Sequence, residues 1–153
     1  MEGSKVRGRK RHILVDTAGH LLAVVVHAAD VGEREGARWV LHVTQRWWHA
    51  LQKLWADQGY SGDDLAQWLL REYGITLEVV SRPADQEGFV VLPRRWVVER
   101  TLAWLGRSRR LSKEYEHWPE YSETVIYLAS LQLLLKRRAP DRIQKLPYAR
   151  QAA

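Results

Sequence analysis

The stretch that most constrains the fold is residues 21–27, with the sequence LLAVVVH. Its β-branched residues favour a strand, and its apolar character on both faces is typical of a central strand. A shorter apolar run precedes it at residues 13–15, and the intervening residues 16–20 have the composition of a compact turn. Two apolar runs joined by so short a turn predict an antiparallel hairpin.

The rest of the chain alternates between strand-like and helix-like periodicity. We expect strands at residues 53–57 and 76–80, and helices at residues 33–49, 63–73, 92–116 and 119–138. Gly74 is expected to end the second of these helices, because glycine readily adopts the positive φ of a helix C-terminus. This order of elements predicts an α/β fold with one mixed sheet covered by helices.

Composition narrows the class of partner. The chain has 153 residues and a formal net charge of +6, which favours nucleic acid first and a membrane surface second. No apolar run is long enough to cross a bilayer, so we expect no membrane-spanning segment and a cytoplasmic location. The chain has no cysteine, which excludes disulfides and thiolate metal sites.

Glu99 lies in a run that is otherwise mostly apolar or arginine. The arginines near it in sequence are Arg94, Arg95, Arg100, Arg107, Arg109 and Arg110. A carboxylate among these arginines could be a functional acidic group that acts next to a bound polyanion. The alternative is a surface helix on which Glu99 forms an ion pair with Arg95 or Arg100.

Two aspartates stand at the C-terminal ends of predicted strands, at the place where ligands collect in open α/β sheets. Asp57 is a candidate metal ligand, because Mg²⁺ and Mn²⁺ prefer oxygen donors, and its alternative role is to cap an Asx-type turn. Asp16 is followed by Thr-Ala-Gly, which predicts an ordinary turn. The spacing of Asp57 and Glu99 does not show whether the two carboxylates converge.

The sequence lacks the motifs of several other kinds of catalytic or nucleotide-binding site. It has no Walker-type phosphate loop, no His-Glu-x-x-His zinc helix and no Gly-x-Ser-x-Gly nucleophile motif. The eight tryptophans are predicted mainly to pack in the protein interior. Trp96 and Trp104 lie in the basic stretch, and for these two residues base stacking is an alternative.

Four sequence blocks resemble, in the same order, the transposases of bacterial insertion sequences of families five and four. They are GRKRHILVDT at residues 8–17, LAVVVHAAD at 22–30, WADQGY at 55–60 and GFVVLPRRWVVERT at 88–101. The resemblance implies an RNase H-like fold and a DDE active site that uses Mg²⁺ or Mn²⁺. Residues 1–138 would form a partial catalytic domain, followed by a flexible tail at residues 139–153.

The resemblance also implies roles for individual residues. Asp57 would match the second catalytic aspartate, and Glu99 the glutamate of the Arg-x-x-x-Glu signature, both as metal ligands. The residues expected to contact DNA phosphates are Arg95, Arg100, Arg107, Arg109, Arg110, Lys10 and Arg11. Leu92 stands where the family usually has tyrosine, and Arg107 lies one position from the usual basic residue.

The family's first catalytic aspartate lies on an opening strand upstream of the block at residues 8–12. That strand and the DNA-binding region before it are expected to be absent from this chain. We therefore expect the C-terminal part of a transposase that is inactive alone. The alternative is an inactive basic DNA-binding remnant, which competes for transposon ends or associates with itself or with full-length transposase.

Overall fold

The structure is a computed structural model that describes residues 8–44, 49–81 and 94–139. β1 (Arg9–Val15) pairs antiparallel with β2 (Leu21–Ala28), which confirms the predicted hairpin. β3 (Lys53–Ala56) pairs in parallel with β4 (Thr76–Val79). The α/β character is therefore confirmed. The described strands, however, form two separate two-stranded sheets, where the sequence predicted one mixed sheet.

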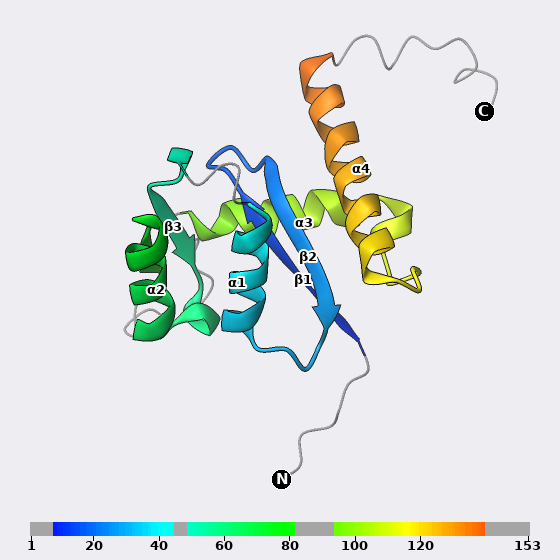
Figure 1. Cartoon of the computed structure of the whole chain (residues 1–153). Coiled ribbons are helices and arrows are strands. Elements are labelled where there is room, and N and C mark those ends of the chain that lie inside the picture. The colour runs from blue at the N-terminus through cyan, green and yellow to red at the C-terminus, as the bar shows by residue number, and fades with distance from the viewer. Residues whose placement is uncertain (1–7, 45–48, 82–93, 140–153) are drawn as a thin grey trace, which may run out of the picture.

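Helices cover both faces of the strands (Figure 1). The helical elements are α1 (Glu33–Val43), the short 3₁₀ turn η2 (Gln58–Tyr60), α2 (Asp63–Tyr73), α3 (Arg95–Gly106), a second 3₁₀ turn η3 (Arg109–Leu111) and α4 (Pro119–Arg138). α1 and α2 form one layer, and their apolar side chains pack together with those of all four strands. α3, η3 and α4 pack on the opposite side of the hairpin.

β2 is buried on both faces, as its sequence predicted. Ala23 packs into the cluster formed with α1 and α2, while Val24 and Val26 pack into the cluster formed with α3, η3 and α4. Burial on both faces does not place β2 between two strands. Its outer edge is closed by α4 instead, because Tyr127 and Glu123 accept hydrogen bonds from the backbone N–H groups of Val24 and Val26.

Two helices match the residues that the sequence predicted. α2 spans Asp63–Tyr73 and ends at Gly74, whose φ of 66° is the left-handed conformation expected of a C-terminal glycine. α4 spans Pro119–Arg138, with proline in its first turn and three basic residues in its last turn. Both helices carry their start and stop signals within a few residues of their ends.

Three predicted boundaries are wrong. The first strand begins at Arg9 rather than at residue 13, because Lys10 forms an ion pair with Glu33, and Arg9 and Arg11 with Glu114. The helix predicted at 33–49 ends at Val43, where the Thr44 hydroxyl donates to the carbonyls of Val40 and Leu41.

The helix predicted at 92–116 is also shorter than expected. α3 covers only Arg95–Gly106, after which the chain turns through η3 and buries Leu111 against β2 and α4. Residues 92 and 93 lie outside the described part of the chain. No described helix is long and apolar enough to cross a membrane.

Candidate active site

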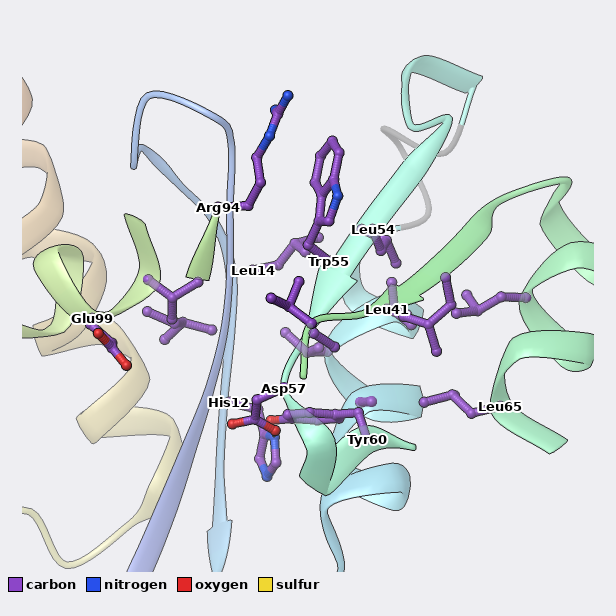
Figure 2. A pocket seen from close by; sticks show the side chains of 18 of the residues that line it. His12, Leu14, Leu41, Leu54, Trp55, Asp57, Tyr60, Leu65, Arg94 and Glu99 are labelled. Atoms are coloured by element: carbon purple, nitrogen blue, oxygen red, sulfur yellow. The ribbon is translucent and has the colours of Figure 1, made fainter. Parts of the chain in front are cut away.

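A cavity of about 360 Å³ lies between β1 and β3 (Figure 2). Residues 11–14 of β1 and residues 54–57 at the end of β3 all contribute to its wall. Successive side chains of a strand point to opposite faces, so a cavity lined by consecutive residues runs along the strand edges. Side chains of α1 and α2 line it from one layer of helices, and side chains of α3 line it from the other.

The structure brings Asp57 and Glu99 to the wall of this one cavity. Asp57 is half-buried directly after β3, and Glu99 is an exposed residue of α3 flanked in the cavity wall by Val98 and Leu102. Figure 2 shows the two side chains on different sides of the hairpin strands, with Asp57 beside His12 and Tyr60. Both carboxylates nevertheless border one cavity, a placement that sequence spacing could not show.

The side chain of Asp57 is held by its own turn. Its Oδ1 accepts a hydrogen bond from the Gly59 N–H at 2.9 Å and caps η2, while its carbonyl accepts from the Tyr60 N–H at 3.1 Å. The Asx-turn role considered for this aspartate is therefore present. It fixes the carboxylate at the mouth of the cavity, so the turn role and a metal-binding role are compatible.

His12 and Tyr60 form a neutral part of the cavity wall. The His12 Nδ1 and the Tyr60 hydroxyl are hydrogen-bonded at 2.7 Å, and the His12 ring stacks on His27 with centroids 4.6 Å apart. Burial, followed by the charges of Asp57 and Glu33, raises the pKa of Tyr60 to about 12. Burial and the neighbouring His27 lower the pKa of His12. Both side chains are therefore uncharged at pH 7.

Asp16 lies elsewhere and does not line the cavity. Its Oδ1 accepts hydrogen bonds from the N–H groups of Ala18 and His20, and its Oδ2 pairs with the His20 Nδ1 at 2.8 Å. Burial alone would raise the pKa of Asp16, but these hydrogen bonds outweigh it, and the net effect lowers that pKa. The prediction of an ordinary turn is confirmed.

Comparison with known proteins assigns the chain to a family. Residues 2–130 match the family model described as a transposase DDE domain. The chain belongs to this family. A Burkholderia cepacia protein named "Putative transposase for insertion sequence element IS402" is 32% identical over 116 residues, which cover 71% of this chain and 54% of that relative. The chain thus spans about half the length of the relative, and no solved structure matches it.

The resemblance to insertion-sequence transposases is therefore confirmed at the level of the family. Roles for individual residues are a separate question, because membership of the DDE family does not by itself assign them. Among the residues that the structure describes, no three His, Cys, Asp or Glu side chains lie close enough to hold a metal ion together. Within the described part of the chain, Asp57 and Glu99 are the two acidic residues on the cavity wall.

Several basic residues expected to bind DNA have partners within this DDE domain. Arg100 donates to the Ala18 carbonyl at 2.9 Å and lies between the rings of Trp96 and Trp104, 4.2 and 4.5 Å from their centroids. Lys10 and Arg11 form the ion pairs described above, and Arg110 pairs with Glu116 at 2.8 Å. The two tryptophans considered for base stacking therefore already stack on arginine.

Arg107 and Arg109 differ from this group. Both are exposed, and neither forms an ion pair within the described residues. The side chain of Arg95 lies outside the described part of the domain, so its predicted contact with phosphate stays a prediction. Of the predicted arginines whose side chains the structure describes, Arg107 and Arg109 are thus exposed and without an ion pair to a described residue.

Sequence reasoning assigned no role in a site to four of the polar and aromatic residues of the cavity wall. Arg94 places its guanidinium 4.3 Å from the ring centroid of Trp55, and His12 joins Tyr60 as described. Trp55 and Tyr60 stand in the same WADQGY block as Asp57, which is the signal that could have indicated them. His12 likewise stands in the block at residues 8–17, but the strand was predicted to begin after it.

Proposed function

We propose that this chain is the C-terminal part of a DDE transposase catalytic domain with an RNase H-like fold. In the complete enzyme it supplies two carboxylates, Asp57 and Glu99, for Mg²⁺-dependent cleavage and transfer of DNA strands at insertion-sequence ends. The observation that carries this proposal is that β3 and α3 bring these two side chains to one cavity. Membership of the transposase DDE family supports the class of reaction.

The residues present fit a hard divalent cation. Asp57 and Glu99 both offer carboxylate oxygens, the donors that Mg²⁺ and Mn²⁺ prefer, and His12 and Tyr60 are neutral. Arg11 and Arg94 also line the cavity, but Arg11 is paired with Glu114 and Arg94 lies over the ring of Trp55. The remaining coordination positions of the ion would be filled by water, by substrate phosphate or by a carboxylate outside the described residues. When bound, such ions stabilise charge on the attacking and leaving oxygens of an in-line phosphoryl transfer.

The fold holds both carboxylates on supported elements. The Gly59 N–H orients Asp57, and the Thr101 hydroxyl docks α3 by donating to the Gly19 carbonyl at 3.1 Å. Arg100 adds a second contact from α3 to the same turn, through the Ala18 carbonyl. Rigid support matters because a catalytic group displaced by about 1 Å loses much of its effect.

Binding to DNA would come mainly through phosphates. We assign this role first to the exposed Arg107 and Arg109, next to α3 and close in sequence to Glu99. Contacts of this kind position the duplex without reading its sequence, and they weaken as salt concentration rises. The net charge of +6 and these two arginines also favour the second candidate function, a DNA-binding fragment without catalysis.

The test is Mg²⁺- or Mn²⁺-dependent cleavage of insertion-sequence-end DNA by this chain and by a version extended upstream. The Glu99→Gln variant of each is the matched control, because glutamine keeps the size of the side chain and removes its charge. We expect cleavage by the extended chain and its loss in Glu99→Gln. Binding of DNA without cleavage by the extended chain would favour the non-catalytic function. Cleavage that survives Glu99→Gln would remove Glu99 from the site.

A further inference from the structure

α4 carries apolar side chains on two opposite faces. Its inner face packs against β2, where Ile126 and Ala129 are buried. Its outer face carries a row of exposed residues, called here the outer stripe: Tyr121, Thr124, Leu128, Leu131 and Leu135. A helix that is apolar on two opposite faces is expected to be buried on both. The inner face has its partner in β2, whereas the outer stripe is open to solvent.

The outer stripe has the spacing of a contact between two helices. Its members follow one another at intervals of three, four, three and four residues, which are the a and d positions of a heptad pattern. At about 100° per residue they lie within about 80° of one another around the helix, on the side opposite Ile126. The Thr124 hydroxyl donates to the Glu120 carbonyl at 2.8 Å, so the stripe adds no unsatisfied donor to an interface.

The C-terminal half of the outer stripe is its most apolar part. Leu128, Leu131 and Leu135 are 60%, 50% and 54% exposed. Figure 1 shows this half of α4 extending away from the two sheets, where another molecule can reach it. Exposed apolar side chains gathered in this way mark a protein interface. Leucine offers no group to a phosphate, so the stripe is separate from the DNA-binding role assigned to Arg107 and Arg109.

Charge is segregated along α4. Glu120 lies in its first turn, and Lys136, Arg137 and Arg138 lie in its last turn. A parallel pair of such helices would bring two basic ends together. An antiparallel pair places the basic end of each helix beside the acidic start of the other and also aligns opposite ends of the two helix dipoles. Charge complementarity therefore selects the same helix, running in the opposite direction, as the partner.

We propose that the outer stripe binds the outer stripe of a second copy of this chain, as an antiparallel helix pair about a two-fold axis. The surface is then self-complementary, as a two-fold interface requires. Leu128 is the middle residue of the stripe and lies at the axis, against Leu128 of the second copy. Tyr121 lies opposite Leu135 of the second copy.

The flank of the stripe agrees with this arrangement. Glu120 and Arg138 are 18 residues apart, which is five turns of about 3.6 residues, so both lie on the same side of α4. In the antiparallel pair, Glu120 is therefore next to Arg138 of the second copy. The same contact is repeated on the other side of the two-fold axis.

This inference goes beyond the proposed function. No described residue of α4 lines the cavity that contains Asp57 and Glu99. Association through α4 is measured without DNA and without a metal ion, so its failure would leave the assignment of the two carboxylates unchanged. Loss of the catalytic proposal would equally leave the helix pair standing.

Sedimentation equilibrium of the full chain tests the association. We expect a dimer at concentrations up to about 100 µM. Leu128→Glu should weaken the dimer by about 100-fold or more, because two carboxylates would face each other at the axis. Leu70→Glu is the matched control, since Leu70 is also 60% exposed but lies on α2. It should leave the dissociation constant unchanged.

A charge exchange tests the flanking contact. Glu120→Arg should weaken the dimer by about tenfold, because it places two arginines next to each other at both ends of the pair. Adding Arg138→Glu to the same chain should restore the dimer, since the two charges have then changed places. A double variant that remains as weak as Glu120→Arg would overturn the antiparallel arrangement.

Cross-linking tests the direction of the helices independently. The chain has no cysteine, so an introduced cysteine is the only thiol. A short bis-maleimide should link Tyr121→Cys to Leu135→Cys in a mixture of the two variants. It should not link Leu135→Cys to itself, because the two copies of this position lie about 20 Å apart along an antiparallel pair.

Four further outcomes would overturn the proposal. The first is a chain that stays monomeric at about 100 µM. The second is a dimer that Leu128→Glu leaves unchanged, or that Leu70→Glu weakens equally. The third is efficient linking of Leu135→Cys to itself, which would indicate a parallel pair. The fourth is loss of the dimer in a version extended upstream, which would assign the outer stripe to the added polypeptide.

Discussion

The chain turns after β1 and after β3 through the same Asx-type hydrogen bond, but the two turns have different neighbours. Asp16 accepts a hydrogen bond from the N–H two residues ahead at 2.9 Å, and Asp57 does the same at 2.9 Å. At the first end, α3 closes the turn through Thr101 and Arg100. At the second end, Asp57 faces a cavity that also contains Glu99. The local motif therefore does not distinguish a structural aspartate from a candidate catalytic one.

The largest expected difference between the two ends is in catalysis. In the complete transposase, we expect Asp57→Asn to lower the rate of DNA cleavage by about 10²-fold or more, because it removes a charge at the proposed metal site. Asp16→Asn should leave that rate nearly unchanged. Asparagine keeps an Oδ1 acceptor at both turns, so thermal unfolding serves as the control for folding. Equal losses of rate in the two variants would contradict the assignment of a catalytic role to Asp57 and a structural role to Asp16.

A second contrast concerns the glycines of the two turns. Gly19 has φ of 85°, and a Cβ there would lie 2.8 Å from the Thr101 hydroxyl oxygen. Gly59 would place its Cβ 3.1 Å from the Asp57 Oδ1, without a positive φ. We expect Gly19→Ala to cost about 1–3 kcal/mol of unfolding free energy and Gly59→Ala less than about 1 kcal/mol.

Urea denaturation measures both glycine variants, with unchanged m-values as evidence that only stability differs. A larger loss in Gly59→Ala than in Gly19→Ala would show that the second turn, and not the first, is the tightly closed one.

The smallest expected effect is the response of the Asp16 turn to acid. The folded state lowers the pKa of Asp16 below its ordinary value of 3.8, so its hydrogen bonds add stability above that value. This contribution is lost as the pH falls through the lowered pKa. Urea unfolding between about pH 5 and pH 2.5 should therefore show a shallower loss of stability in Asp16→Asn than in the unsubstituted chain. Thr17→Ala, in the same turn, is the control that should keep the original slope.

The sequence by itself determined the elements whose signals are local. The β1–β2 hairpin, the whole of α2 with its C-terminal Gly74, and the whole of α4 were predictable because strand periodicity, caps and turn residues act over a few positions. The sequence also indicated Asp57 and Glu99, through their placement and their family blocks. It could assign the family because those blocks occur in a fixed order.

Only the tertiary structure decided which distant groups meet. β1 begins at Arg9 because acidic residues far along the chain neutralise its basic start, and Arg100 stacks between tryptophans instead of pointing to solvent. Asp57 and Glu99 border one cavity because the fold brings the end of β3 and one side of α3 to it. α4 is apolar on two faces, and only its packing against β2 decides which of them stays exposed. Such contacts depend on packing between segments dozens of residues apart, which no local pattern encodes.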